Sequence, residues 1–277
     1  MTPNCYSANP KTFYNHEAHM VAPYSPFPIN PFKQGLKERR RMIGCWCTLA
    51  SPISAEILGL AGFDWLQLDC EHSLNDPLTI VPQLMALKDS LSAPVVRPPW
   101  NDTVLIKRFL DAGVYNLLIP YVESAEEAHA AVKATRYPPE GVRGLGMMVR
   151  SNKWATQPDY LKTINDNIAV IVQVESAKGL ENVEEIAAVE GVDAVFCGPG
   201  DLSATMGHLN NAQVPKVQEA IKHIAETARS AGKSAAILAG GKEDVELYTG
   251  YGYTCIAIGN DASILRNGAQ AMMDAYK

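Results

Sequence analysis

The sequence predicts an α/β protein built as one (β/α)8 barrel, the TIM barrel, and three observations support this fold class. The chain has 277 residues, close to the roughly 250 that a single barrel uses. From residue 36 onward it repeats a short apolar run, a turn rich in Gly, Pro or Asp, and an amphipathic stretch, which is typical of a parallel sheet. Eight such runs occur, and this number predicts closure into a barrel.

The eight runs are the expected strands, and the stretches between them are the expected helices. Apolar residues recur every three or four positions in ISAEILGLAG, DTVLIKRFLDAG and VPKVQEAIKHIAETARSAG, and each stretch ends in Gly, a common helix stop. An open doubly wound sheet would need a G-x-G-x-x-G turn after its first strand, and none stands there. The expected strands are residues 43–49, 65–70, 94–98, 116–122, 168–175, 193–199, 234–239 and 254–259.

Residues 1–35 are expected to form an irregular extension ahead of the barrel, which spans residues 36–277. The segment PYSPFPINPF contains four prolines, so we expect no regular element in it. The extension lacks the apolar core of a signal peptide and the Arg-rich pattern of a transit peptide. No stretch approaches the roughly 18 apolar residues of a membrane helix. We therefore expect a cytoplasmic protein with no membrane partner.

Composition narrows the function classes further. The chain carries 24 Lys and Arg against 30 Asp and Glu, a net charge of −6, and no basic stripe. Nucleic acid is therefore not an expected partner, because few cations are available to neutralise phosphates. The six cysteines lack paired C-x-x-C spacing and mostly lie in or beside apolar runs, which predicts buried free thiols in a reducing compartment.

Two carboxylates, Glu175 and Asp201, follow neighbouring predicted strands and stand 26 residues apart, about one βα unit. In a barrel this spacing places both at the C-terminal rim, where a hard divalent cation could be held against an oxygen-rich substrate. A carboxylate that closes the run IAVIVQV would be desolvated without a cation or another partner. Asp201 has an alternative role as a helix cap.

Other strand ends are also polar. Asp69, Arg97 and Gln173 lie at the ends of the second, third and fifth runs, and His72 follows the second. A His base, an Arg that can fork onto a carboxylate and a metal would together suit proton abstraction near a carbonyl. Two structural alternatives stay open: Arg97 could pair with Glu71 or Asp69 only to hold the rim, and His72 could be a core histidine.

Two other barrel chemistries compete with the metal site. A Schiff-base aldolase needs a desolvated Lys on a strand, and no predicted strand ends in Lys. Lys178 is the nearest to the rim, and we expect it on the first turn of a helix. A phosphate-binding barrel would instead use Gly240, Gly241 and the turn Gly259–Asp261 as anion loops.

Over nearly all of residues 36–277 the chain resembles the HpcH/HpaI family of class II pyruvate aldolases, including the 2-keto-3-deoxy-L-rhamnonate and 4-hydroxy-2-oxoheptanedioate aldolases. The resemblance rests on a series of long motifs in a shared order. They are GFDWLQLDCEHSLND, PVVRPPWNDTVLIKRFLDAG, ATRYPPEGVRGLG, IVQVESAKGLENVEEI, VEGVDAVFCGPGDLSATMGH and IAIGNDASIL.

The resemblance implies a metal-dependent enzyme, usually hexameric, that reversibly cleaves a 4-hydroxy-2-oxo acid to pyruvate and an aldehyde through a metal-stabilised pyruvate enolate. Oxygen ligands favour Mg, Mn or Co over zinc. An oxaloacetate decarboxylase, a carbon–carbon bond-forming enzyme like macrophomate synthase, and a barrel that binds a 2-oxo acid without turnover remain alternatives.

The resemblance also implies a role for each site residue. Metal ligands are Glu175 and Asp201, with Gln173 beside them. His72, oriented by Asp69, would be the base, and Arg97 would contact the pyruvyl oxygen. The remaining implied positions are Asp111 at a subunit contact, Trp46 and Leu238 in the pocket wall, and the amides near Gly200 and Asp201 for the substrate carboxylate.

Overall fold

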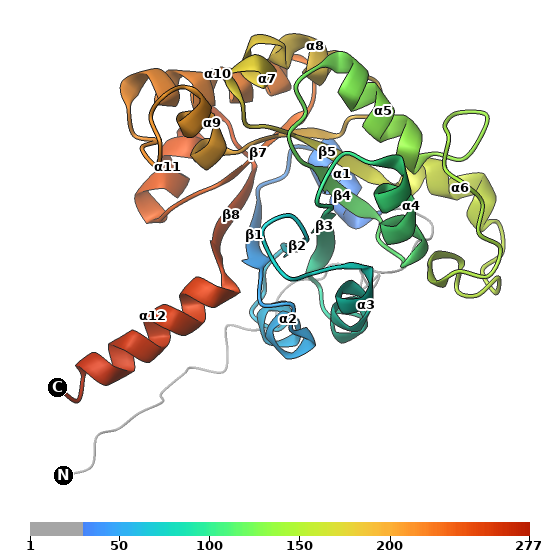
Figure 1. Cartoon of the computed structure of the whole chain (residues 1–277), viewed down its shortest axis with the longest axis horizontal. Helices are drawn as coiled ribbons and strands as arrows, with labels where there is room; N and C mark the ends of the chain where they lie inside the picture. Colours follow the sequence, from blue (N-terminus) through green and yellow to red (C-terminus); the bar gives the residue numbers. More distant parts are fainter. Residues whose placement is uncertain (1–29) are drawn as a thin grey trace.

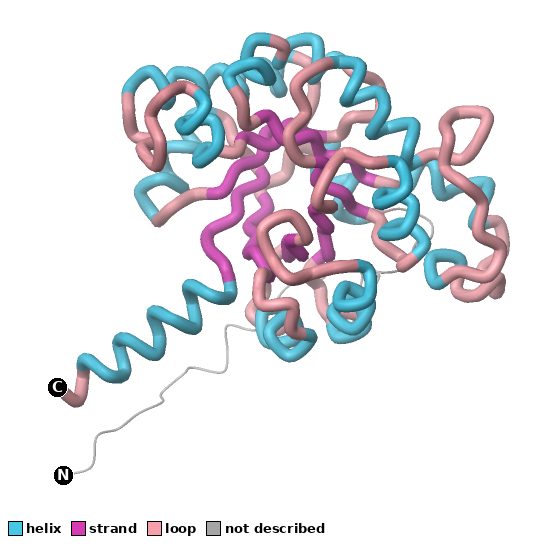
Figure 2. The backbone as a smooth tube through the Cα atoms, viewed as in Figure 1, coloured by secondary structure: helices cyan, strands magenta, loops and turns pink. Residues whose placement is uncertain are grey.

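A computed structural model describes residues 30–277 and has the predicted fold. Eight parallel strands form a closed barrel in sequence order, with helices around it (Figures 1 and 2). Every neighbouring pair is parallel, and β8 closes the barrel against β1. The strands are β1 Met42–Cys47, β2 Trp65–Asp69, β3 Ala93–Arg97, β4 Asn116–Ile119, β5 Ala169–Val174, β6 Ala194–Cys197, β7 Ser234–Leu238 and β8 Cys255–Asn260.

All three helical stretches predicted from periodicity are confirmed. Side-chain caps fix several helix starts: Ser51, Asp76, Asp102 and Ser124 each accept a backbone N–H of the first turn. The helices are α1 Pro31–Lys37, α2 Pro52–Gly59, α3 Pro77–Ala86, α4 Thr103–Asp111, α5 Ala125–Thr135, α6 Tyr160–Asn167, α7 Ala177–Glu181, α8 Val183–Ala188, α9 Pro199–Thr205, α10 Pro215–Ser230, α11 Lys242–Tyr251 and α12 Asp261–Asp274, with a 3-10 turn at Arg150–Asn152.

The predicted irregular extension ends earlier than expected. Helix α1 begins at Pro31, a proline position that a first helical turn tolerates, and Asn30 caps it by accepting from the amides of Phe32 and Lys33. Phe32 and Leu36 are buried, because α1 packs against the inner core of the barrel. The prediction is therefore wrong for residues 31–35. Its remaining part, residues 1–29, lies outside the described residues.

Two apolar layers hold the barrel together. One lies between strands and helices, and the other fills the barrel itself, where Trp65 contacts Phe32 at a ring-centroid distance of 6.2 Å. The five cysteines in the described part are buried and free, as predicted, while Cys5 lies outside it. No helix among residues 30–277 is long and apolar enough to cross a membrane.

The last helix, α12, leaves the barrel and extends away from it (Figure 1). Apolar side chains on it are exposed: Ile264 by 51%, Leu265 by 65% and Met272 by 70%. A helix packed along its own barrel would bury such residues. Within this chain, α12 therefore covers little of the apolar surface.

Candidate active site

Arg97, the last residue of β3, links the polar groups at the C-terminal rim. Asp69, directly opposite it on β2, accepts from Nε at 2.8 Å and from Nη2 at 3.0 Å. Glu71 forms an ion pair with Nη1 at 2.8 Å, and Gln173 Oε1 lies 3.5 Å from the same nitrogen. Of the five guanidinium N–H groups, four are thus directed at these partners and one remains available.

Trp46 supports this arginine from inside the barrel. The guanidinium carbon lies 4.3 Å from the centre of the Trp46 ring, a cation–π contact. Phe196 meets the same tryptophan edge-on at 6.3 Å. Because Arg97 is only 4% exposed, its charge depends on this ring and on the two acids for stabilisation. Trp46, predicted to line the pocket wall, thus lies against the arginine at the mouth.

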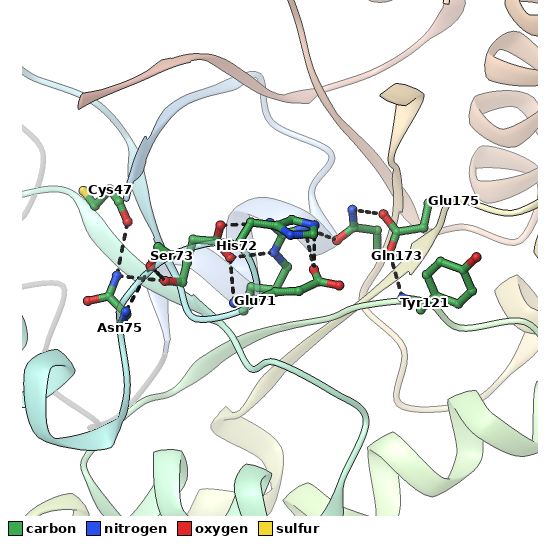
Figure 3. A network of polar contacts seen from close by, with 10 residues as sticks. Cys47, Glu71, His72, Ser73, Asn75, Tyr121, Gln173 and Glu175 are labelled. Carbon is green, nitrogen blue, oxygen red and sulfur yellow. Dashed lines mark hydrogen bonds and ion pairs between the residues drawn. The ribbon is translucent and has the colours of Figure 1, made fainter. Parts of the chain in front are cut away.

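Glu175 follows β5 and is almost fully buried, at 2% exposure. Its Oε1 accepts the backbone N–H of Tyr121 at 2.9 Å, and its Oε2 accepts Gln173 Nε2 at 2.6 Å. Figure 3 shows Glu71, His72, Gln173 and Glu175 in one row, with Tyr121 beside Glu175. The row joins the ends of β2 and β5 across the mouth of the barrel.

The environment of Glu175 opposes its negative charge. Burial, followed by the charge of Glu71, raises its pKa to about 8, and Asp201 contributes in the same direction. Burial also raises the pKa of Glu71, although Arg97 counteracts it. The negative charges of these acids therefore act against one another at the rim.

Asp201 lies in the first turn of α9, directly after Gly200, and its side chain is exposed. Gly198 begins this turn and packs against Glu175. A Cβ added there would lie 2.6 Å from Glu175 Oε2 and 2.7 Å from its Cβ. Only glycine lets the β6–α9 turn approach Glu175 this closely, which brings the two predicted metal ligands to one side of the mouth.

The β2–α3 loop, which carries Glu71 and His72, is held by its own polar contacts. Asn75 and Ser73 both donate to the backbone carbonyl of Asp69, and Asn75 also reaches the Cys47 carbonyl at 3.4 Å (Figure 3). Gln83 from α3 donates to Asn75 Oδ1 at 2.6 Å. This network fixes the direction of the loop over the barrel.

His72 has a different partner from the one expected. Both carboxylate oxygens of Asp69 accept from Arg97, and the nearest acid to His72 Nε2 is Glu71, at 3.9 Å. Within the described residues the structure thus brings Asp69 together with Arg97 rather than with His72. The His72 side chain is 64% exposed, which excludes the core-histidine alternative.

The other predicted positions divide between the rim and the opposite face. Leu238 ends β7 and, with Gly200, lines a cavity of about 670 Å³ beside the rim. Asp111 ends α4, which runs back from the C-terminal end of β3 to the start of β4. Asp111 thus lies at the opposite face of its own barrel, where it pairs with Arg143 at 3.0 Å.

The structure also tests the two competing chemistries. Lys178 lies on α7, 61% exposed and paired with Glu123 at 3.2 Å, so it is not the desolvated lysine of a Schiff-base aldolase. At the first proposed anion loop, Asp244 already accepts the Gly240 amide at 2.9 Å. At the second, the buried Asp261 accepts the Thr48 amide and hydroxyl. Each of the two loops thus carries an acid of the chain itself, which disfavours a bound phosphate.

The donor groups at the rim fit a hard divalent cation. No group of three His, Cys, Asp or Glu side chains with metal-binding geometry occurs among residues 30–277. Magnesium is commonly held by one or two carboxylates, with substrate and water completing the shell. Glu175 and Asp201 provide two such oxygen donors, and a cation beside Glu175 would offset the burial that raises its pKa.

Comparisons with known proteins agree with this geometry. The family model for HpcH/HpaI aldolase/citrate lyase matches residues 42–268. The chain belongs to this family. A 5-keto-4-deoxy-D-glucarate aldolase from Klebsiella pneumoniae is 54% identical over 251 residues, covering 91% of this chain and 98% of the relative.

Solved structures give the same result. An HpcH/HpaI aldolase/citrate lyase family protein from Burkholderia cenocepacia matches with a TM-score of 0.86 and 40% identity, covering 90% of this chain and all of that one. Macrophomate synthase matches with a TM-score of 0.78 and 27% identity, covering 99% of this chain and 98% of the other. Aldolases and citrate lyases both cleave carbon–carbon bonds, so the HpcH/HpaI protein described here is a carbon–carbon lyase. This assignment removes the alternative of a barrel that only binds.

Sequence reasoning missed two contributors to the site. Glu71 was considered only as a rim partner of Arg97, although it is also the main charge that acts on Glu175. Tyr121 supplies a backbone amide rather than a side chain, and it does so from a left-handed conformation with φ 55°. Its position after the end of β4 was the available signal, but no residue type reveals a backbone donor.

Replacing Gly198 with Ala should misplace Glu175. The added Cβ would overlap Glu175, and displacement of a reacting group by about 1 Å can reduce kcat/KM on the order of 100-fold. Steady-state kinetics checks this, with Gly250→Ala as the control, since a Cβ there meets no atom within 4 Å. Equal activity of the two variants would contradict the steric account.

Replacing Glu71 with Gln should lower the pKa of Glu175 in the metal-free protein. The variant removes the negative charge that acts most strongly on Glu175, so its ionised form becomes easier to reach as pH rises. Carbon-13 NMR titration of the glutamate carboxyls measures this, with the exposed Glu38→Gln as the control. An unchanged Glu175 titration would show that burial alone sets its pKa.

Proposed function

We propose that the protein is a divalent-metal-dependent aldolase that cleaves 5-keto-4-deoxy-D-glucarate to pyruvate and tartronate semialdehyde. The observation that carries the proposal is the buried Glu175 at the barrel mouth, beside Gln173 and the Arg97 network. The substrate follows from relatives of that name at 54% identity. This sugar diacid replaces 2-keto-3-deoxy-L-rhamnonate and 4-hydroxy-2-oxoheptanedioate as the favoured substrate.

Glu175 and Asp201 would hold the cation, which we expect to be Mg, Mn or Co. When bound, the ion would act as a Lewis acid toward the 2-oxo acid and balance the charge of both acids. Gln173 has a supporting role, because its amide fixes Glu175 Oε2 at 2.6 Å and leaves Glu175 little freedom to rotate. A closely held first ligand is what a precise binding geometry needs.

The chemistry begins with the hydroxyl of carbon 3 in the glucarate numbering, two carbons from the keto group. His72, exposed at the mouth, would accept that proton, directly or through water. The bond between carbons 3 and 4 then breaks. Carbon 3 becomes the aldehyde carbon of tartronate semialdehyde, and carbons 4 to 6 leave as the pyruvate enolate. Protonation of carbon 4 gives pyruvate.

Arg97 would stabilise the enolate oxygen. Its guanidinium is fixed by Asp69, Glu71 and the Trp46 ring before substrate arrives. A donor that needs no reorganisation during reaction contributes on the order of 3 kcal/mol to transition-state stabilisation. Asp69 is thus a positioning residue for Arg97, while Glu71 lies between Arg97 and His72.

A homo-oligomer, hexameric by family resemblance, is part of the proposal. The exposed apolar side chains of α12 support it, because Leu265 and Met272 would be covered by a second copy. The place of Asp111 also supports an oligomer, because Asp111 lies at the face of its own barrel opposite the mouth. A neighbouring chain would bring Asp111 near the site.

Metal removal should abolish pyruvate release and metal return should restore it. The assay compares 5-keto-4-deoxy-D-glucarate with 2-keto-3-deoxy-L-rhamnonate, 4-hydroxy-2-oxoheptanedioate and oxaloacetate, after EDTA treatment and after addition of Mg or Mn. We expect the highest kcat/KM for the glucarate. Pyruvate release from oxaloacetate alone would instead identify a decarboxylase.

Replacing His72 with Ala should lower kcat by 10²- to 10⁴-fold, the usual contribution of a general base. Pyruvate affinity should stay unchanged, because His72 is not among the proposed groups that bind the 2-oxo acid. Single-turnover kinetics and calorimetric titration with pyruvate separate the two effects. Full activity in His72→Ala would assign the base elsewhere.

A further inference from the structure

A second cavity lies at the N-terminal face of the barrel, opposite the proposed active site. Its volume is about 470 Å³. Ala235 and Thr254 place it at the beginning of β7 and just before β8, whereas Glu175 and Arg97 lie at the other ends of their strands. Helices α10 and α11 contact each other beside it. The cavity is therefore separate from the proposed catalytic chemistry.

Three arginines supply all the charge of this cavity: Arg39, Arg41 and Arg229 line it, together with Thr249 and Thr254 and glycine backbone. No Asp or Glu lines it. Within residues 30–277, none of the three guanidinium groups forms an ion pair or a hydrogen bond. The chain as a whole is acidic, with a net charge of −6. Three unpaired cations in one cavity are therefore not expected from its composition.

Stabilisation of a helix end explains the position of only one of these three arginines. Arg229 lies in the last turn of α10, where a cation stabilises the helix end. Its guanidinium covers Gly252, where an added Cβ would lie 2.5 Å from Nη1. Arg41 directly precedes β1 and ends no helix. Arg39 has a φ of 52°, a conformation that favours Gly or Asn over Arg.

The acid closest to these arginines in sequence is engaged elsewhere. Glu38 accepts from Gln34 Nε2 at 2.6 Å. The guanidinium groups of Arg39 and Arg41 thus remain directed at solvent and the cavity. Arginine presents a planar fork of N–H donors that matches phosphate oxygens, and the Thr249 and Thr254 hydroxyls add two shorter donors.

We propose that this cavity binds a small phosphorylated molecule. Three guanidinium groups balance the charge of a phosphate or pyrophosphate group, and 470 Å³ accommodates a compact phosphate ester. A cavity lined by three arginines, in a chain with a net charge of −6, suits a small ligand rather than a polymer. The proposal is independent of the substrate and mechanism of the aldolase site.

Calorimetric titration of the full chain, stripped of metal, with inorganic pyrophosphate tests the proposal. We expect one site per chain, and at least tenfold weaker binding in both Arg41→Gln and Arg229→Gln. Affinity should fall as salt increases, because exposed charges are screened. Arg108→Gln is the matched control, since Arg108 is also an exposed arginine in the last turn of its helix.

Two further measurements separate loss of binding from loss of folding and from binding at the catalytic mouth. Arg41 has no partner within the described residues, so Arg41→Gln should keep the melting temperature even if Arg229→Gln lowers it. Pyrophosphate affinity should also be unchanged in Arg97→Lys, which alters the cation of the catalytic mouth and leaves the cavity intact. Absence of binding, equal affinity in Arg41→Gln and the parent, or weaker binding in Arg97→Lys would each overturn the proposal.

Discussion

The buried carboxylate of Glu175 is the constraint on which the barrel mouth depends. A charge removed from water costs several kcal/mol unless it is paired or bonded, and this one receives two hydrogen bonds but forms no ion pair within residues 30–277. Its surroundings follow from that constraint. The Tyr121 amide is presented by a left-handed residue, Gln173 is fixed beside it, and Gly198 leaves room for its oxygens.

Arg97 forms the opposing half of the mouth. Its contacts with Asp69, Glu71 and Trp46 fix a cation at the end of β3, two strands from Glu175 at the end of β5. The arrangement keeps positive charge near Glu71 without neutralising Glu175, whose pKa stays raised. A divalent ion held by Glu175 and Asp201 would add positive charge at the mouth, and the fixed Arg97 guanidinium would stabilise negative charge that develops on the substrate.

The sequence was sufficient for the barrel, because apolar runs and helical periodicity are local signals, and the lack of a G-x-G-x-x-G turn ranked the doubly wound sheet below the barrel. Strand-end reasoning also located Glu175, Arg97 and Gln173 at one rim. It could not show which partner a side chain selects. Asp69 was expected beside His72, and in the structure a bidentate arginine across the β2–β3 pair donates to both of its oxygens. Residue types likewise gave no sign of the Tyr121 amide or of the α1 start at Pro31, which depends on the Asn30 cap.

The central claim is that Glu175, although buried and hard to ionise, is a ligand for one divalent cation per chain. Electron paramagnetic resonance titration of Mn(II) into the metal-free protein tests it most directly, by comparing the parent with Glu175→Gln and with the remote Glu184→Gln. The account predicts one bound Mn(II) per chain in the parent and in Glu184→Gln, and a loss of affinity of about 100-fold or more in Glu175→Gln, since only two protein carboxylates hold the ion. Equal Mn(II) affinity in all three proteins would contradict the account and place the cation elsewhere.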